Sequence, residues 1–382
     1  MHSSQESLAR IPQPDLVSKT NLVKGGGEMS VEKLRVAVVG AGYWGPNLAR
    51  NFAASPEWEL AAVCDLDMGR AKAVADRVGA PATSSLCEVL DDTSIHAVAI
   101  ATPARTHGQI ASAALDKGKH VVVEKPLADS REVGVDMVEI AERCGLVLMA
   151  DHTYCYTPAV LKIRELIASG EIGEILYVDS IRINLGLIQP DVDVLWDLAP
   201  HDLSILDFIL PDGLDMAEVS AVGSDPLHTG KACVGYLTLP LGNGGIAHVH
   251  VNWLSPTKIR QMVIAGTLRT IVWDDLNPQQ RISVYDRGID LDTQSRTTAN
   301  MTPATISYRL GNMWAPALAE QEALANMATE FAAAIQGRRA ARTSGRSGLR
   351  VLSVLEAAEQ SLARGGMPMT VEHGVVKSGV LL

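Results

Sequence analysis

The chain has 382 residues and a mass of 40.7 kDa, a length typical of two or three domains. Apolar residues make up 47% and charged residues 20%, so the chain can bury large cores and is too apolar to be disordered. The net charge of −11 and the aromatic content of 4% argue against nucleic acid and anionic membranes as partners. No apolar run reaches the roughly 18 residues of a membrane-spanning helix, so we expect a soluble, cytoplasmic protein.

Residues 1–32 are predicted to form a disordered tail. They are rich in Ser, Pro and Gly and lack both a regular period and the apolar core of a secretory signal. Translation beginning at Met29 is a hypothesis, because residues 24–28 can be encoded by the purine-rich codons of a ribosome-binding site. The intact mass of the native protein tests it, and a mass that includes residues 1–28 would contradict it.

Residues 33–152 alternate short β-branched runs with segments of helical period. Near-continuous apolar runs are typical of strands buried on both faces of a parallel sheet. The runs cover 34–40, 59–65, 97–102, 120–126 and 146–152, and the helical segments cover 46–54, 68–78, 106–117 and 131–144. This rhythm predicts an α/β domain with a doubly wound parallel sheet.

Residues 153–372 are predicted to form a second domain, and residues 373–382 a short tail. A helix over 156–169 is followed by longer runs that alternate apolar and polar residues, which is typical of an antiparallel sheet with one solvated face. The runs cover 174–185, 217–225, 231–241, 245–254, 259–275 and 281–286. Helical spacing returns over 196–209, 318–335 and 349–364.

The five cysteines are scattered and form no CxxC pair. Their odd number in a long chain indicates reduced, buried thiols in a cytosolic protein. They are Cys64, Cys87, Cys144, Cys155 and Cys233.

The strongest motif is GAGYWG, which follows the first predicted strand and opens the first predicted helix. In this context Gly40 allows a tight turn, Gly42 lets a pyrophosphate approach the backbone, and Gly45 permits close packing of the helix. The phosphates would bind free amides at the positive helix end. We therefore predict a Rossmann domain that binds a dinucleotide, with Tyr43 and Trp44 of the same loop in the cofactor site.

The nature of the dinucleotide is predicted from Asp65, which ends the second strand 20 residues after Gly45. A carboxylate there binds the adenosine ribose hydroxyls and repels a 2′-phosphate, which favours NAD over NADP. NADP stays possible because Arg70 could accommodate a phosphate, so both residues belong to the predicted cofactor site.

Glu124-Lys125-Pro126 ends the fifth predicted strand. Ligands bind at the carboxyl ends of parallel strands, so Glu124 and Lys125 are predicted to face the cofactor crevice. The Lys125 ammonium could donate a hydrogen bond to a substrate hydroxyl and stabilise a developing alkoxide. The alternative is a surface lysine ahead of a helix.

Asp197 and His201 lie four residues apart, so on a helix they share one face. A carboxylate beside an imidazole can orient it and raise its basicity, as a general base requires. A buried structural Asp–His pair is the alternative. Because proline disrupts a helix interior, Pro200 is predicted to lie in the first turn of the helix.

A TPxxxH segment follows the fourth predicted strand, at the same edge of the sheet, and contains Thr102, Pro103 and His107. Thr102 is expected to contact the nicotinamide half of the cofactor, and His107 is expected to start a helix within the cofactor site. His248 and His250 alternate on one strand without a third ligand at metal spacing, so we predict surface residues and no metal site.

Together these residues resemble the Gfo/Idh/MocA family, which includes glucose–fructose oxidoreductase and inositol dehydrogenase. The resemblance covers about residues 33–372 and rests on the order of GAGYWG, the acid at Asp65, TPxxxH, EKP and the DxxxH pair, with a Glu-rich helix ahead of Gly337. It implies a Rossmann domain followed by an α/β domain with a large open antiparallel sheet. It also implies a cis bond before Pro126 and a homodimer or homotetramer built on the outer face of the sheet.

The resemblance also implies catalytic roles. His201 would accept the hydroxyl proton as hydride leaves the carbinol carbon, Lys125 would polarise the oxygen, and Asp197 would hold a neighbouring hydroxyl or orient His201. Further hydroxyl contacts are guessed at Asp202, Tyr154, Asn184 and Gln189.

Two bacterial branches of the family look most similar. One contains cyclitol or aminocyclitol dehydrogenases of antibiotic pathways, and the other contains nucleotide-sugar 3-dehydrogenases and ketoreductases. The sequence contains no obvious arginine cluster for a nucleotide diphosphate, which favours a cyclitol or free sugar.

Three further alternatives stay open. The same residues could reduce a keto-sugar, because one transition state serves both directions. The protein could be a dinucleotide sensor, although a sensor needs no acid–base group. It could also cleave glycosides with a tightly held NAD.

Overall fold

The computed structural model describes residues 33–189, 191–291 and 306–373. The predicted N-terminal tail, with its alternative start at Met29, and residues 374–382 of the predicted C-terminal tail lie outside this part of the chain.

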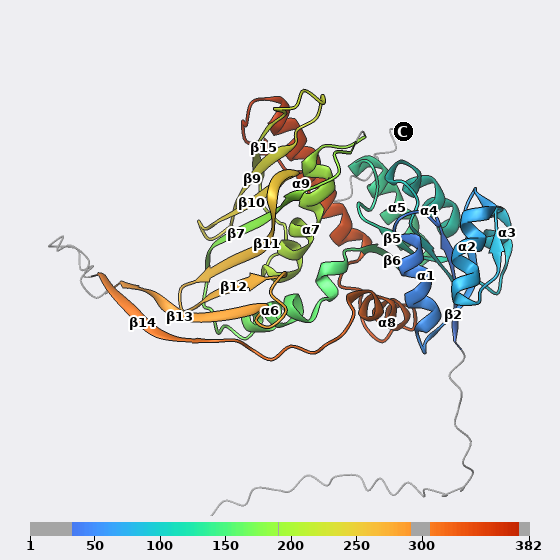
Figure 1. The fold of residues 1–382 in the computed structure, drawn as a ribbon, viewed down its shortest axis with the longest axis horizontal. Coiled ribbons are helices and arrows are strands. Elements are labelled where there is room, and N and C mark those ends of the chain that lie inside the picture. Colours follow the sequence, from blue (N-terminus) through green and yellow to red (C-terminus); the bar gives the residue numbers. More distant parts are fainter. Residues whose placement is uncertain (1–32, 190, 292–305, 374–382) are drawn as a thin grey trace, which may run out of the picture. The chain divides into compact units, whose positions relative to one another are not determined.

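The first sheet is parallel throughout and has six strands in the order β3-β2-β1-β4-β5-β6 (Figure 1). Its central strands are almost fully buried, which confirms the prediction from the apolar runs. The strand order reverses between β1 and β4, and such a switch point opens a ligand crevice at the carboxyl ends of the strands. The strands are β1 (Leu34–Val39), β2 (Trp58–Cys64), β3 (Ala82–Thr83), β4 (Ala97–Ile100), β5 (His120–Glu124) and β6 (Leu148–Asp151).

Helices connect these strands at the predicted places. The short α3 and β3 were not predicted, because six and two residues are too few to show a period. The helices are α1 (Gly45–Ala54), α2 (Met68–Val78), α3 (Leu86–Asp91), α4 (His107–Asp116) and α5 (Arg131–Cys144).

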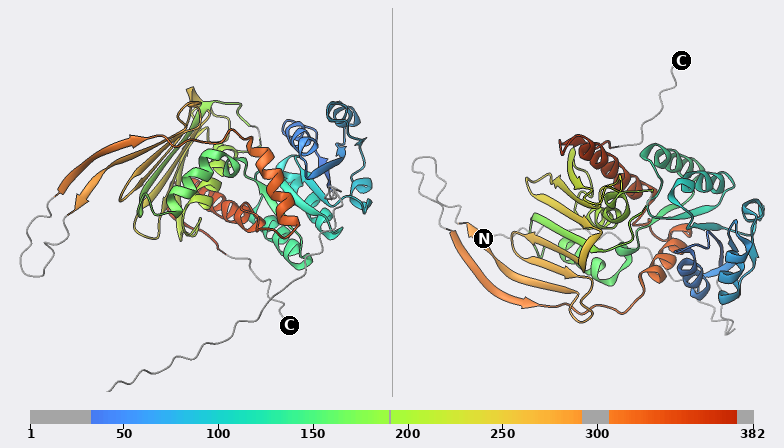
Figure 2. Two further views of the ribbon diagram at one scale, coloured as in Figure 1. Left: turned by 90° about the horizontal axis from the view of Figure 1, so that it is seen from below. Right: turned by 45° about the horizontal axis from the view of Figure 1, so that its top comes forward.

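The second sheet has nine strands in the order β14-β13-β12-β11-β7-β10-β9-β8-β15. It is antiparallel as predicted, except that β10 pairs with β7 in parallel. Helices α6 (Pro158–Ala168) and α7 (Val194–Ile209) lie on one face, and no described helix covers the other face (Figure 2). The strands are β7 (Ile175–Leu185), β8 (Glu218–Ser224), β9 (Val234–Pro240), β10 (Ile246–Asn252), β11 (Leu254–Gly266), β12 (Thr270–Asp274), β13 (Ile282–Leu291), β14 (Ile306–Trp314) and β15 (Met369–Thr370).

Two predictions about the second domain were wrong. The run 259–275 is not one strand, because the chain turns after Gly266, whose N–H donates to the Arg269 carbonyl at 2.9 Å. Pro200 lies in the second turn of α7, because the helix begins at Val194 after a cap formed by Asp193. The Pro200 nitrogen cannot donate to the Trp196 carbonyl, so the helix has one hydrogen bond fewer beside the site.

The C-terminal helices α8 (Ala323–Ile335) and α9 (Gly345–Ala363) return to the first domain. Helix α8 packs against α1, and the Trp58 indole donates to the Ala328 carbonyl at 2.8 Å. Helix α9 contacts α5 of the first domain and α7 of the second. On one side Ser353 accepts from Arg131 at 3.1 Å, and on the other Arg350 donates to Asp207 at 2.6 Å.

All five cysteines are free thiols. Cys87 and Cys144 are exposed, contrary to the prediction of buried thiols, because they lie on the solvent sides of α3 and α5. Within the described residues, no helix combines the length and the apolarity needed to cross a membrane.

Candidate active site

A cavity of about 790 Å³ opens at the carboxyl ends of the parallel strands. This volume is typical of a small-molecule or cofactor site. Of the predicted cofactor residues, only Gly45 lies behind the lining. The others line the cavity: Gly40, Gly42, Tyr43, Trp44, Asp65, Arg70, Thr102, Pro103, His107, Glu124 and Lys125.

The glycine loop has the shape that a bound pyrophosphate needs. Gly40 has φ +99°, and a Cβ there would lie 2.6 Å from the Ala101 carbonyl group. A Cβ on Gly45 would lie 1.9 Å from the Gly40 oxygen, so α1 packs closely on the loop. A Cβ on Gly42 would meet no atom within 4 Å, so this position faces open space. No side chain caps α1, and the Gly45 amide at its start can bind a phosphate oxygen, whereas Pro46 has no N–H and the Asn47 amide donates to the Trp44 carbonyl at 2.9 Å.

Asp65 lies at the adenosine end of the cavity, directly after β2. Its Oδ2 accepts from the Ala41 amide at 2.8 Å, and its Oδ1 accepts from the Asp67 amide at 2.9 Å. Arg70 forms an ion pair with Asp65 at 3.2 Å. The carboxylate is therefore fixed beside the glycine loop, where it can accept from ribose hydroxyls.

Asp65→Ser is expected to shift binding toward the 2′-phosphorylated cofactor by at least about tenfold, because it removes the repelling carboxylate and leaves Arg70 without this partner. Fluorescence titrations with NADH and NADPH measure the ratio of the two dissociation constants. Asp76→Ser, an exposed change in α2, is the control. An unchanged ratio in Asp65→Ser would assign the selection to another residue.

Lys125 lies at the other end of the cavity, and its peptide bond to Pro126 is cis, as the resemblance implied. Its Nζ donates to the Asp197 carbonyl oxygen at 2.8 Å and lies 3.5 Å from Asp197 Oδ1. Asp197 Oδ2 accepts from the Trp253 indole at 3.0 Å. These contacts bring the predicted Lys125 and Asp197 together across the two domains.

His201 follows Asp197 by one turn of α7, but no described hydrogen bond joins the two side chains. The Asp197 carboxylate turns instead toward an ammonium and an indole N–H. The suggestion that Asp197 orients His201 therefore finds no support, whereas a role in holding substrate stays open.

The His201 ring is half-buried and packs edge-on against Tyr154, with 5.2 Å between ring centroids. Its Nδ1 is enclosed and has no hydrogen-bond partner among the described residues. Burial lowers the pKa of His201 well below its ordinary value, so the imidazole is neutral at pH 7 and can accept a proton. Nearby cationic or basic side chains lower the pKa further: Lys125, Arg182, His152 and Arg260.

Two arginines that the sequence did not bring together lie near His201. Arg182 in β7 and Arg260 in β11 are cross-strand partners. The Arg182 guanidinium lies 4.5 Å from the centre of the Tyr154 ring. Arg260 is about one third exposed and pairs loosely with Asp275 at 3.4 Å. Both guanidinium groups on the side of the site that faces β7 and β11 are paired with carboxylates, Arg182 with Asp202 and Arg260 with Asp275.

Asp202 is not available as a hydroxyl contact, contrary to the guess from sequence. Its carboxylate accepts from Arg182 at 2.7 and 3.0 Å and from Ser180 at 2.9 Å, and the Arg182 and Asp202 side chains are 3% and 2% exposed. A buried guanidinium needs this counter-charge, so Asp202 supports the fold beneath the site.

Asp202→Ala is expected to destabilise the protein by about 3–5 kcal/mol, because it leaves the Arg182 charge buried without a partner. Thermal and urea unfolding measure the loss. Asp179→Ala, on the exposed face of the same β7 strand, is the matched control. A loss no larger than that of the control would show that Arg182 finds another partner.

The other predicted contacts divide into two groups. Tyr154 adjoins His201, as described above, while no described contact joins Asn184 or Gln189 to it. His107 starts α4 as predicted and is buried, with Nδ1 2.9 Å from the Pro126 oxygen and Nε2 2.8 Å from the Thr102 oxygen. It thus ties the TPxxxH segment to the loop that carries Lys125.

Three further residues around this site were not predicted: Asp151, His152 and Trp253. Asp151 ends β6 and His152 follows it, at the same edge of the sheet as Lys125, so the position at the end of a parallel strand could have indicated both. Burial raises the pKa of Asp151 to about 6 and lowers the pKa of His152 to about 4. Trp253 precedes β11, and no sequence signal connects it with Asp197.

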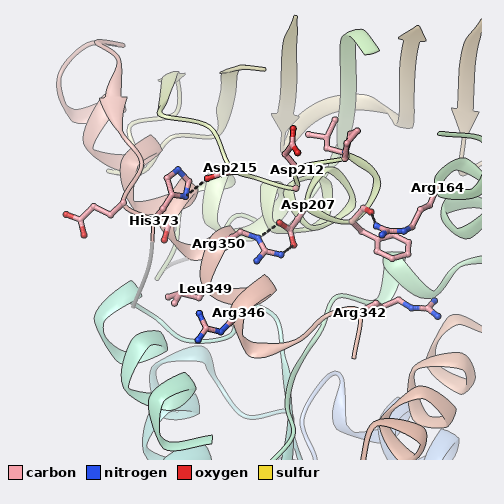
Figure 3. Close-up of a pocket in the computed structure, with 15 residues that line it drawn as sticks. Arg164, Asp207, Asp212, Asp215, Arg342, Arg346, Leu349, Arg350 and His373 are labelled. Atoms are coloured by element: carbon pink, nitrogen blue, oxygen red, sulfur yellow. Dashed lines mark hydrogen bonds and ion pairs between the residues drawn. The ribbon is translucent and has the colours of Figure 1, made fainter. Parts of the chain in front are cut away.

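A second cavity of about 540 Å³ lies between α6, α7 and α9 (Figure 3). Its four arginines are paired with protein acceptors: Arg350 with Asp207, Arg346 with Glu142, Arg342 with Glu330, and Arg164 with the Phe208 carbonyl. Since this cavity contains no predicted site residue and its arginines already have partners, we assign it no function.

His248 is exposed on the helix-free face of the sheet, and the partly exposed His250 stacks on Tyr236 with 4.3 Å between ring centroids. Both are surface residues of the sheet, as predicted. No group of three metal-binding side chains occurs in the part of the chain that the structure describes.

Two family descriptions match the chain. Residues 34–152 match the oxidoreductase family with an NAD-binding Rossmann fold, and residues 160–272 match the GFO/IDH/MocA C-terminal domain. The chain therefore belongs to the Gfo/Idh/MocA oxidoreductases, and its Rossmann domain binds NAD.

Named relatives support this assignment. A UDP-N-acetylglucosamine 3-dehydrogenase of Acidithiobacillus ferrooxidans is 30% identical over 84% of this chain and 94% of its own length. Inositol 2-dehydrogenase 2 of Saccharopolyspora erythraea is 29% identical over 57% of this chain and 66% of its own length. The crystal structure of GenD2 from gentamicin A biosynthesis, in complex with NAD, covers 92% of this chain and 100% of its own, with 26% identity and a TM-score of 0.74. The chain is thus an oxidoreductase of a family that acts on sugar and inositol alcohols, which removes the sensor alternative.

Proposed function

We propose that the protein transfers hydride between nicotinamide and a secondary alcohol or ketone of a cyclitol or sugar, in antibiotic or secondary-metabolite biosynthesis. The observation that carries this proposal is the contact of Lys125 with Asp197. It links the end of the NAD cavity to the helix turn that carries His201. A substrate carbon at this junction would have a hydrogen-bond donor and a base within reach.

The chain's residues have separate tasks in this reaction. Bound NAD supplies the hydride acceptor. Lys125 donates a hydrogen bond to the substrate oxygen and stabilises negative charge that develops there. His201, neutral at pH 7, takes the hydroxyl proton. In the reducing direction His201 returns the proton to the carbonyl oxygen. Asp197, fixed by Trp253, can accept from a neighbouring hydroxyl.

A nucleotide sugar is the second candidate substrate, as for a nucleotide-sugar 3-dehydrogenase or 3-ketoreductase. Arg260 is partly exposed and only loosely paired, so it can bind a phosphate or carboxylate. The relative named as a UDP-N-acetylglucosamine 3-dehydrogenase supports the same candidate. Against it, Lys125, Arg182 and Arg260 each have a carboxylate partner, which leaves little free positive charge.

The test is NAD reduction, followed by NADH absorbance, against inositols, aminocyclitols, free sugars and UDP- or dTDP-sugars. Turnover of a cyclitol or free sugar supports the first candidate, and turnover of nucleotide sugars alone supports the second. If no alcohol reacts, NADH oxidation with the matching ketones tests the reverse direction. Silence in both directions would contradict the proposal. If NAD stays bound through purification and returns to its oxidised state in each turnover, the result would favour the alternative of glycoside cleavage.

We also propose a homodimer or homotetramer in the cytoplasm. Exposed apolar side chains on the helix-free face of the second sheet support assembly: Tyr177, Val222, Tyr236 and Ile246. The five free thiols support a reducing compartment. Light scattering of the full chain distinguishes monomer, dimer and tetramer.

A further inference from the structure

Two carboxylic acids lie opposite each other beside Lys125. Strands β5 and β6 lie side by side (Figure 1). Glu124 ends β5 and Asp151 ends β6, and the two are direct partners in the parallel pairing of these strands. Partners in adjacent strands point to the same face of the sheet, where like charges repel. Glu124 lines the NAD cavity, and Asp151 lies behind it, bonded to Trp44 of the lining.

The two carboxyl groups differ in their hydrogen bonds. Asp151 Oδ2 accepts from the Trp44 indole at 3.1 Å, and Oδ1 accepts from the Thr153 hydroxyl at 3.1 Å. Glu124 lines the cavity, and its Oε2 is enclosed without a hydrogen-bond partner among the described residues. Asp151 thus has donors that stabilise a negative charge, whereas Glu124 Oε2 has none.

The surroundings of the two carboxyl groups favour their protonated forms to different extents. Burial raises the pKa of Glu124 well above its usual range, and Asp151 and Asp197 raise it further, while Lys125 opposes them. Burial also raises the pKa of Asp151 to about 6, against the hydrogen bonds from Trp44 and Thr153. Glu124 Oε2 has no donor to stabilise a negative charge, whereas both oxygens of Asp151 accept hydrogen bonds, so a proton resides on Glu124 in preference to Asp151.

The proposed function places the reacting carbon at Lys125, and so the nicotinamide ring must lie at the same end of the cavity. Asp65 and Arg70 line the opposite, adenosine end. The oxidised ring carries a positive charge, and the reduced ring is neutral. A negative charge on Glu124 would therefore favour the oxidised cofactor only.

We propose that the Glu124–Asp151 pair responds to the redox state of the cofactor, releasing its proton to solvent when NAD⁺ binds and retaining it when NADH binds. The Glu124 O–H bond is the bond that breaks, and no electron changes place in this binding step. The inference rests on the proposed function only for the position of the nicotinamide.

The affinity for NAD⁺ should depend on pH. Below neutral pH the pair must lose its proton before it can stabilise NAD⁺, so NAD⁺ affinity falls as pH falls, by up to about tenfold per pH unit for one proton. The reduced ring of NADH is neutral and gains nothing from a charge on Glu124, so NADH binds with the proton in place and its affinity changes little over the same range.

Calorimetry at pH 7 in two buffers of different ionisation enthalpy counts the protons released by NAD⁺ and by NADH. We expect greater release with NAD⁺, approaching one proton, and close to none with NADH. Effects of the adenosine and phosphate groups are common to both cofactors, so they cancel when the proton release with NADH is subtracted from that with NAD⁺. Titrations of the wild-type protein from pH 5.5 to 8.5 should show a dissociation constant for NAD⁺ that depends on pH more steeply than that for NADH.

Glu124→Gln keeps the shape of the side chain and removes the titrating proton, so the difference between NAD⁺ and NADH should disappear. Asp151→Asn removes the negative charge that faces Glu124, so Glu124 can ionise before the cofactor binds. The number of protons released when NAD⁺ binds should therefore fall. Glu132→Gln, an exposed change in α5, is the matched control. Equal proton release by the two cofactors in the wild type, or a difference that persists in Glu124→Gln, would overturn the inference. Because no sugar is present, these results are independent of whether the proposed substrates react.

Discussion

Lys125→Met is expected to lower kcat/KM for alcohol oxidation by about 10²- to 10⁴-fold, while the dissociation constant for NADH changes by no more than a few-fold. Methionine keeps most of the side-chain volume but removes the ammonium that contacts Asp197 and would contact the substrate oxygen. Steady-state kinetics with the best substrate of the panel, together with NADH fluorescence titration, separate the two effects.

Lys162→Met is the control for this change, because Lys162 is a surface residue of α6 that pairs with Glu165. It should leave both quantities unchanged. Turnover in Lys125→Met equal to that of the control would remove Lys125 from the mechanism. A parallel loss of NADH affinity would instead make it a cofactor-binding residue.

His201→Ala is expected to lower kcat for oxidation by a similar factor, because the proton of the substrate hydroxyl loses its acceptor. In the wild type at saturating NAD⁺, kcat/KM for the alcohol should stay on its plateau below pH 6.5, since the pKa of His201 lies well below that value. As pH falls further, His201 becomes protonated and the rate declines. A profile measured from pH 5 to 9 checks this limb.

Arg260→Gln offers an independent test of the same assignment. Arg260 is one of the cations that lower the pKa of His201, so its removal should move the acid limb toward higher pH. Arg269→Gln, in the turn between β11 and β12 and paired with Glu171, should leave the limb in place. An acid limb that persists unchanged in His201→Ala would mean that another group titrates.

The first domain could be predicted closely from sequence, because its signals are local. Apolar runs gave the buried strands, and the glycine motif placed the phosphate-binding turn between β1 and α1. Asp65 and Lys125 were found by the same means, since each directly follows or ends its strand. Asp151 ends β6 at the same edge of the sheet, so its position indicates a site residue equally well, but it was not predicted.

The second half of the site depends on contacts between distant segments, which one sequence does not show. Arg182 and Arg260 become neighbours only through the register of β7 with β11. The same register leads Arg182 to bind Asp202, which removed that residue from the expected hydroxyl contacts. Trp253 likewise fixes Asp197 from 56 positions away. The spacing of Asp197 and His201 correctly indicated a shared helix, but not that Asp197 would turn toward Lys125.

Helix α9 has a consequence for how the cofactor enters and leaves. Its Ser353 accepts a hydrogen bond from Arg131 of α5, and its Arg350 donates to Asp207 of α7. The same helix is therefore bonded to both domains. A hinge rotation of the two domains about residue 152 would have to break one of these hydrogen bonds or bend α9. We therefore expect the crevice to open by small sliding movements of packed helices, the shear type of domain motion. Exchange of NAD for NADH in each turnover then has to proceed without a wide swing of the domains.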